Sequence, residues 1–62
     1  MDVLRKFRES LGLTMQGFAE SMGISKSLYE KVESGVRKPS RNFMQKLKMK
    51  YPQFDVNIFL IN

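Results

Sequence analysis

The sequence predicts an all-α fold, with five short helices in one compact domain that spans residues 1–62. Apolar residues recur at helical spacing through most of the chain, which is typical of amphipathic helices. Residues that cap the starts of helices alternate with glycines that end them. They are Thr14, Ser25 and Ser40 for the starts, and Gly12, Gly23 and Gly35 for the ends. A chain of this length buries only about 60% of its unfolded surface, so we expect one small core.

The first two helices are expected at residues 2–11 and 14–21. Asp2 and Thr14 are suitable N-caps for them, since each can accept a hydrogen bond from a free backbone N–H group. Gly17 inside the second helix costs about 1 kcal/mol relative to alanine, and the sequence offers no reason for it. The residues expected to face the core are Leu4, Phe7 and Leu11 in the first helix, and Phe18, Ala19 and Met22 in the second.

The third helix is expected at residues 25–34, after a tight turn at Gly23. A left-handed turn favours a residue without Cβ, and the hydroxyl of Ser25 can cap the helix that follows. Gly35 ends it. The inward face carries Tyr29 and Val32, and the opposite face carries Lys26, Ser27, Glu30 and Lys31.

The last two helices are expected at residues 41–51 and 56–60. Pro39 keeps the residue before it out of a helix, and Pro52 interrupts the chain after the fourth helix. Asp55 is a candidate cap for the fifth. The inward face of the fourth helix consists of Phe43, Met44, Leu47 and Tyr51, and the spacing of all these aromatic residues indicates packing rather than stacking on bases.

The positive charge is concentrated in the middle of the chain. The formal net charge is +5, yet residues 1–24 hold three basic and three acidic side chains, whereas residues 25–50 hold eight basic and two acidic ones. This middle segment therefore carries a net charge of +6. A concentrated block of positive charge suits a polyanionic partner. A solvated, lysine-rich surface is the alternative on charge alone.

Several classes of function are not expected. The chain contains no cysteine and no histidine, so it lacks disulfides, thiolate metal ligands and the commonest general base. We therefore expect no enzymatic activity, no metal, no cofactor and no small-molecule ligand. No apolar run is long enough to span a membrane and no signal peptide is present, which favours the cytoplasm.

Four segments of the sequence, in their order and spacing, carry a family resemblance. They are L-G-L-T, F-A-x-x-M-G-I-S, K-V-E-S-G and R-K-P-S, and they extend over nearly the whole chain. In this arrangement the chain resembles the phage Cro and repressor (Xre-like) helix-turn-helix DNA-binding family. The resemblance implies a five-helix lambda-repressor-like DNA-binding domain whose second and third helices form the helix-turn-helix.

The resemblance also implies which residues contact DNA. The third helix would read bases in the major groove, where lysine can donate to guanine and glutamate can accept from cytosine. Glu30 has an alternative role, which is to orient Lys26 four residues earlier. Leu28 is expected to point outward toward a thymine methyl group. The residues expected to read bases are Lys26, Ser27, Leu28, Glu30 and Lys31.

A second set of residues is expected to contact phosphates, which fixes the register of a protein on DNA without reading its sequence. Relatives place a phosphate-binding glutamine where this chain has Met15. Because Met15 cannot donate a hydrogen bond, Gln16 is the candidate for that contact. A mobile basic loop is the alternative for Arg37 and Lys38. The full set is Gln16, Ser25, Arg37, Lys38, Ser40 and Arg41.

Two further expectations concern the interior and the tail. The family commonly pairs an arginine of the first helix with a glutamate late in the third, here Arg8 and Glu33, although two solvated charges would contribute little. Residues 54–61 hold six apolar residues in eight. Phe54 and Phe59 are expected to point inward, and a self-covering tail is the alternative to an interface. The residues expected at a dimer interface are Val56, Ile58 and Ile61.

The function implied by the resemblance is that of a Cro-type transcriptional repressor of a bacteriophage or mobile element. It would bind double-stranded operator DNA with palindromic symmetry as a weak homodimer, in the cytoplasm of a bacterial host and on its nucleoid. The alternative is a protein-binding regulator that antagonises a repressor and binds DNA weakly. The apolar tail and the missing helix-two glutamine are compatible with that alternative.

Overall fold

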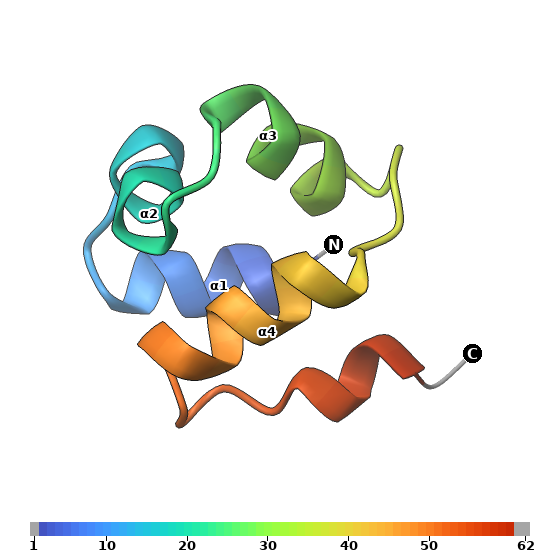
Figure 1. Cartoon of the computed structure of the whole chain (residues 1–62). Coiled ribbons are helices and arrows are strands. Elements are labelled where there is room, and N and C mark those ends of the chain that lie inside the picture. The colour runs from blue at the N-terminus through green and yellow to red at the C-terminus, as the bar shows by residue number, and fades with distance from the viewer. Residues whose placement is uncertain (1, 61–62) are drawn as a thin grey trace.

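The computed structural model describes residues 2–60, which form four α-helices and a final 3₁₀-helix. The helices are α1 (Asp2–Ser10), α2 (Met15–Met22), α3 (Lys26–Ser34) and α4 (Arg41–Lys50), followed by η1 (Val56–Leu60). The expected order is therefore correct, but the fifth element is a 3₁₀-helix rather than an α-helix. α3 packs against α2 and α1, α4 packs against α2, and η1 packs along α4 at the far side from α3 (Figure 1).

Side-chain caps begin three of the four α-helices, as expected. The hydroxyl oxygens of Thr14, Ser25 and Ser40 accept hydrogen bonds from the backbone N–H groups of Gly17, Leu28 and Phe43 at 3.0, 3.1 and 3.1 Å. Asp2 differs from expectation because it is the first residue of α1, where its carboxylate contacts Arg5. Each cap satisfies a donor that the helix geometry leaves without a partner inside the helix.

Gly17 has a structural reason that the sequence does not reveal. A Cβ atom at this position would lie 3.3 Å from the Thr14 Oγ1 atom and 3.8 Å from a methyl group of Leu13. The same Thr14 oxygen accepts the hydrogen bond from the Gly17 N–H group. Glycine therefore gives the cap room, in exchange for part of the helix propensity that alanine would provide.

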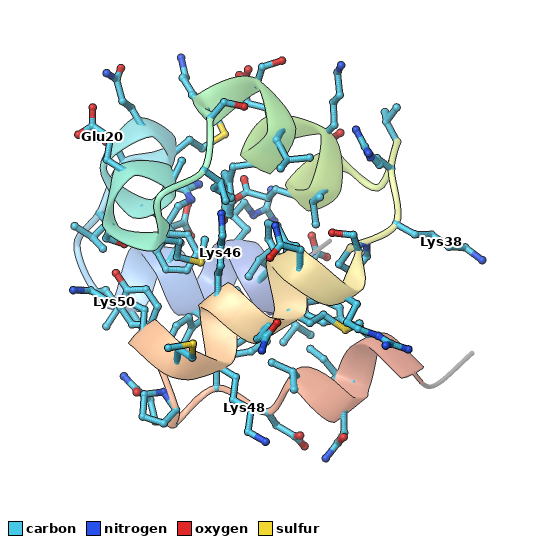
Figure 2. All side chains as sticks on the ribbon, viewed as in Figure 1. Glu20, Lys38, Lys46, Lys48 and Lys50 are labelled. Carbon is cyan, nitrogen blue, oxygen red and sulfur yellow. The ribbon has the colours of Figure 1, made fainter. Side chains whose placement is uncertain are left out.

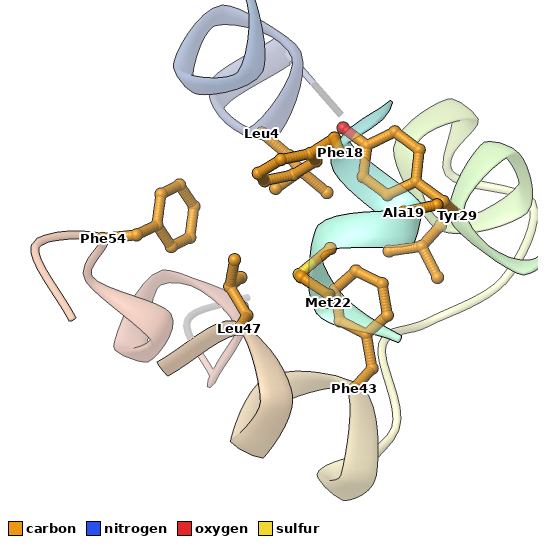
Figure 3. Packing of buried hydrophobic residues seen from close by; sticks show 9 residues of the cluster. Leu4, Phe18, Ala19, Met22, Tyr29, Phe43, Leu47 and Phe54 are labelled. Atoms are coloured by element: carbon orange, nitrogen blue, oxygen red, sulfur yellow. The ribbon is translucent and has the colours of Figure 1, made fainter. Parts of the chain in front are cut away.

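Aromatic rings connect the two ends of the core. Tyr29 lies edge-on to Phe18, with ring centroids 5.2 Å apart, and Phe7 lies between Phe18 and Phe54 at 6.2 and 4.9 Å. Phe59 extends this contact onto η1, at 5.8 Å from Phe54. The packing roles expected for the aromatic residues are confirmed. The residues of the buried cluster are Leu4, Phe18, Ala19, Met22, Tyr29, Val32, Phe43, Leu47 and Phe54 (Figure 3).

Four expectations about side-chain direction need correction. Leu11 is exposed, because α1 ends at Ser10 and the backbone turns at Gly12 with a φ of 71°. Leu28 was expected to point outward, but it is half-buried and packs against the core.

The expected directions of two residues in the C-terminal segment also need correction. Val56 and Ile58 are half-buried and pack against the core, because η1 lies along α4 rather than extending into solvent. Ile61 lies outside the described residues. Tyr51 was expected inside the fourth helix, but it follows α4, and its N–H group donates to the carbonyl of Leu47 at 2.8 Å.

Candidate nucleic-acid interface

The outer face of α3 is polar and accessible over its whole length. Lys26, Ser27, Glu30 and Lys31 are all exposed, whereas Tyr29, Val32 and Glu33 on the other side of the helix are buried. This separation follows from the helical repeat of 3.6 residues, which places residues three or four apart on one face. The structure therefore brings together four of the five residues expected to read bases. Leu28 lies at the edge of this face, with only part of its side chain accessible.

Three features define the turn between α2 and α3: a left-handed glycine, local hydrogen bonds and a contact from α4. Gly23 adopts a left-handed conformation (φ 71°, ψ 31°), which a residue with a Cβ atom rarely adopts. The N–H group of Ile24 donates to the carbonyl of Ala19 at 3.0 Å, and Ser25 caps α3. Lys46 of α4 donates to the carbonyl of Gly23 at 3.4 Å. The start of α3 is therefore fixed relative to both α2 and α4.

The exposed residues expected to contact phosphates lie on both sides of α3 in the sequence. Ser25 and Ser40 use their hydroxyl oxygens to cap helices, which leaves each hydroxyl hydrogen available for donation to an anion. The backbone N–H group of Arg37 donates to the carbonyl of Lys31 at 3.1 Å, which ties the start of the basic loop to α3. Gln16 donates to the carboxylate of Glu20 at 3.2 Å. All six residues of this set are exposed: Gln16, Ser25, Arg37, Lys38, Ser40 and Arg41.

The basic side chains in α4 and in the loop before it point in different directions. Lys38 projects from the loop before α4, whereas Lys48 projects from α4 on the side opposite to α3 in the view of Figure 2. One straight duplex against α3 therefore does not reach every cation of the basic segment. The cations within reach of such a duplex are those on the outer face of α3 and in the loop that follows it.

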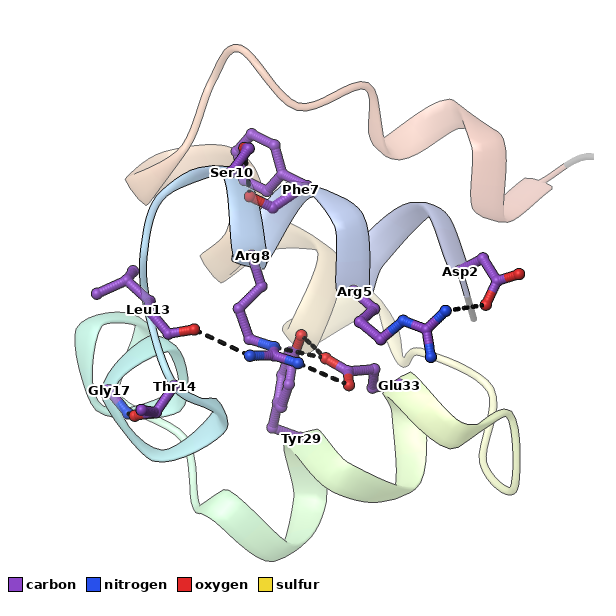
Figure 4. A network of polar contacts seen from close by, with 10 residues as sticks. All are labelled: Asp2, Arg5, Phe7, Arg8, Ser10, Leu13, Thr14, Gly17, Tyr29 and Glu33. Atoms are coloured by element: carbon purple, nitrogen blue, oxygen red, sulfur yellow. Dashed lines mark hydrogen bonds and ion pairs between the residues drawn. The ribbon is translucent and has the colours of Figure 1, made fainter.

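The expected interior ion pair is present and links three parts of the chain (Figure 4). The Arg8 Nε atom donates to the Glu33 Oε2 atom at 2.9 Å, and its Nη2 atom donates to Oε1 at 3.2 Å. The remaining Nη1 atom donates to the carbonyl of Leu13 at 2.9 Å, one residue before the Thr14 cap. The Tyr29 hydroxyl donates to the same carboxylate of Glu33. The side chains of Arg8 and Glu33 are only 12% and 10% exposed, so little solvent screens the pair.

The surroundings of these groups determine their charge. Burial by itself raises the pKa of Glu33. The hydrogen bonds from Arg8 and Tyr29 and the charge of Arg8 together lower it by more than burial raises it, so the pKa of Glu33 lies below its ordinary value. Burial raises the pKa of the Tyr29 hydroxyl, and the neighbouring carboxylate of Glu33 raises it more. At neutral pH the network therefore consists of a charged Arg8–Glu33 pair and a protonated tyrosine.

Two exposed residues near α3 were missed by the sequence reasoning. Ser34 follows Glu30 by four residues on the outer face of α3, so helical spacing alone would have placed it there. Arg5 of α1 lines a groove of about 590 Å³ together with residues of α2 and α3, which no local pattern would have indicated. The alternative role of Glu30 finds no support, because the ion pairs found between side chains of residues 2–60 join Arg5 to Asp2 and Arg8 to Glu33.

The described part of the chain holds no cluster of three or more potential metal ligands. Within that same part, no helix has the length and apolar character needed to cross a membrane.

Comparisons with known proteins agree with this geometry. The model of the helix-turn-helix family matches residues 4–48, which include α1, α2, α3 and most of α4. The chain is 43% identical over 42 residues to YazB of Bacillus subtilis (strain 168), described as an uncharacterized HTH-type transcriptional regulator. That match covers 68% of this chain and 61% of YazB. No solved structure matches the chain. The family match over most of the chain, and the α2–turn–α3 geometry within it, establish that this protein belongs to the Xre-like helix-turn-helix family.

Proposed function

We propose that this protein is a transcriptional repressor of Cro type that binds double-stranded DNA through α3. The observation that carries the proposal is the outer face of α3, where Lys26, Ser27, Glu30 and Lys31 are exposed together on a helix with a fixed start. An α-helix fits the major groove of B-form DNA, where each base pair presents a distinct set of donors and acceptors. The similarity to a transcriptional regulator is consistent with this role.

The side chains of α3 have different chemical tasks in this proposal. Lys26 and Lys31 donate to guanine, and Glu30 accepts from the amino group of cytosine. Ser27 either donates or accepts. The half-buried Leu28 has a smaller role than expected, since only its accessible edge reaches a thymine methyl group. Arg37, Lys38 and Arg41 supply phosphate contacts with Gln16, Ser25 and Ser40, and these contacts set the register.

The operator in this proposal is palindromic, and the protein binds it as a dimer. Two recognition helices must lie about 34 Å apart to read successive major grooves on one side of DNA. The largest extent of the described chain is 27 Å, so a single domain does not supply both helices. The proposed dimer surface consists of the accessible parts of Val56 and Ile58 on η1, together with Ile61, which lies outside the described residues. Because Val56 and Ile58 are half-buried in the monomer, this surface is small and the dimer is weak without DNA.

The setting of the protein is part of the same proposal. A small DNA-binding regulator of this type acts in the cytoplasm of a bacterial host, on the nucleoid, and the origin we propose is a bacteriophage or mobile element. No cofactor or small-molecule ligand is needed for the activity.

The test uses bound sequences selected from a random duplex pool, followed by affinity measurements at several salt concentrations. The logarithm of the binding constant should fall linearly with the logarithm of salt, with a slope of about 0.9 per phosphate contact. Lys31→Ala should reduce the free-energy difference between the preferred base and the others at one position by about 1–3 kcal/mol. Arg37→Ala should instead weaken binding to all duplexes alike and reduce the salt slope. The reverse assignment of these two effects would show that α3 does not read the bases.

A second outcome would favour the repressor antagonist. If the affinity for duplex DNA stays low and insensitive to salt, while the protein binds a purified repressor of its own family, the fold serves protein binding instead. The dimer is tested by sedimentation with and without the selected operator. Binding of one protomer per operator half without cooperativity would remove the dimer from the proposal.

A further inference from the structure

The two flanks of α3 carry very different charge. On one flank, the loop after α3 and the start of α4 supply Arg37, Lys38 and Arg41. On the other flank, the stretch of residues 9–25, which contains α2 and both of its connections, has no lysine or arginine at all. A helix in the major groove lies between two phosphate backbones, so both flanks meet negative charge. The flank formed by α2 therefore lacks a cation of its own.

Arg5 of α1 supplies a cation at this flank. It lines the groove of about 590 Å³ that also takes residues from the start of α2 and the outer face of α3. The residues that line the groove are Asp2, Arg5, Met15, Glu30, Lys31, Glu33 and Ser34. Figure 4 shows Arg5 beside Glu33, between α1 and α3. The groove therefore puts Arg5 on the side of α3 where α2 begins at Met15, along the C-terminal half of the recognition helix.

Each charged residue that lines the groove is offset by a residue of opposite charge, and the pair of Arg5 and Asp2 is the one in which another anion most easily replaces the carboxylate. Glu33 is held by Arg8 and Tyr29, and Glu30 and Lys31 offset one another in formal charge. Arg5 is paired with Asp2, with 3.1 Å between Nη2 and Oδ1, and these side chains are 50% and 76% exposed. An exposed pair of this kind contributes little free energy. A phosphate is able to replace the carboxylate, since guanidinium binds both groups through the same pair of N–H donors.

From this arrangement we propose that Arg5 is the phosphate anchor on the α2 flank of the recognition helix, and that Asp2 holds its guanidinium group until DNA phosphate replaces it. This inference rests on the proposed DNA binding and adds a contact from outside the helix-turn-helix. It gives the protein a cation on each side of α3. It also makes Asp2 a competitor of DNA for the same guanidinium.

The experiment compares four variants on the selected duplex, at several salt concentrations, after thermal melts have shown that each is folded. Arg5→Gln should weaken binding about tenfold and reduce the salt slope by about 0.9, because one phosphate contact is lost. Asp2→Asn should strengthen binding severalfold, because the competing carboxylate is gone. The matched control is Lys6→Gln, which removes the same charge from an exposed neighbour that does not line the groove. Its affinity should stay within about twofold of the parent, because only long-range charge is lost.

The double variant Asp2→Asn with Arg5→Gln separates a direct role of Asp2 from one through Arg5. It should bind as weakly as Arg5→Gln alone, because Asp2 acts only on the guanidinium. Equal affinities for Arg5→Gln and Lys6→Gln, while Arg37→Ala still weakens binding, would overturn the anchor and leave the proposed function intact. Absence of salt-dependent duplex binding in the parent protein would instead overturn the proposed function.

Discussion

The helix-turn-helix end of the molecule and its C-terminal end are held by different kinds of contact. α1, α2 and α3 share apolar packing and, in addition, the directional network of Arg8, Glu33, Tyr29 and the Leu13 carbonyl. η1 is held mainly by apolar contacts, such as that between Phe59 of η1 and Phe54. Apolar packing tolerates small shifts, whereas hydrogen bonds of defined length and angle do not. The geometry is therefore most narrowly defined in the part of the molecule that positions α3.

The largest predicted effect on the free energy of unfolding is at Glu33, in the directional network. Glu33→Ala leaves the Arg8 guanidinium without its carboxylate in a nearly solvent-free site, and we expect a loss of about 3–5 kcal/mol in the free energy of unfolding. A domain of this size has about 3–9 kcal/mol in total, so the variant should lose at least about a third of its stability. Chemical denaturation at neutral pH measures the loss. A change below about 1 kcal/mol would show that the directional network contributes no more than ordinary packing.

A somewhat smaller effect is expected at the other end. Phe54→Ala removes a ring from the edge of the core, and we expect a loss of about 3 kcal/mol, the lower end of the range for buried phenylalanine. Because η1 has few directional contacts, the loss should appear first as local opening of residues 52–60. Amide hydrogen exchange should show this opening while α2 and α3 keep their protection. Equal loss of protection in α3 would mean that the two ends unfold as one unit.

The network also predicts a dependence on acid. Because the pKa of Glu33 is lower in the folded state than in the unfolded state, its contribution is complete above the ordinary glutamate value of about 4.3. It is lost as the pH falls through the lower folded value. The free energy of unfolding should therefore fall from about pH 4.5 downward, and Glu33→Gln should remove part of this slope. An unchanged slope in that variant would assign the acid sensitivity to other carboxylates.

The smallest effect is expected at Gly17. Alanine here gains about 1 kcal/mol of helix propensity, yet its Cβ atom would press on the Thr14 oxygen at 3.3 Å. We therefore expect almost no net change for Gly17→Ala in the parent protein. In a Thr14→Ala background the crowding disappears, so the same substitution should stabilise by about 1 kcal/mol. Thermal melts of the four proteins complete the cycle, and equal effects in both backgrounds would exclude crowding by the cap.

Local rules determined most of the secondary structure. The caps at Thr14, Ser25 and Ser40 and the left-handed glycines at 12, 23 and 35 depend on the chemistry of a few neighbouring residues. The sequence alone was therefore sufficient to place the helices to within one or two residues. The polar face of α3 followed in the same way, since its spacing is a property of one helix.

Only the tertiary structure decided which side chains at the margins of the helices are accessible. Leu28, Val56 and Ile58 are apolar residues whose burial depends on where a neighbouring element lies, and helical spacing does not contain that information. Arg5 likewise lines a groove whose other walls come from the start of α2 and the second half of α3. The burial of the three apolar residues and the position of Arg5 depend on packing between elements, which no local sequence pattern specifies.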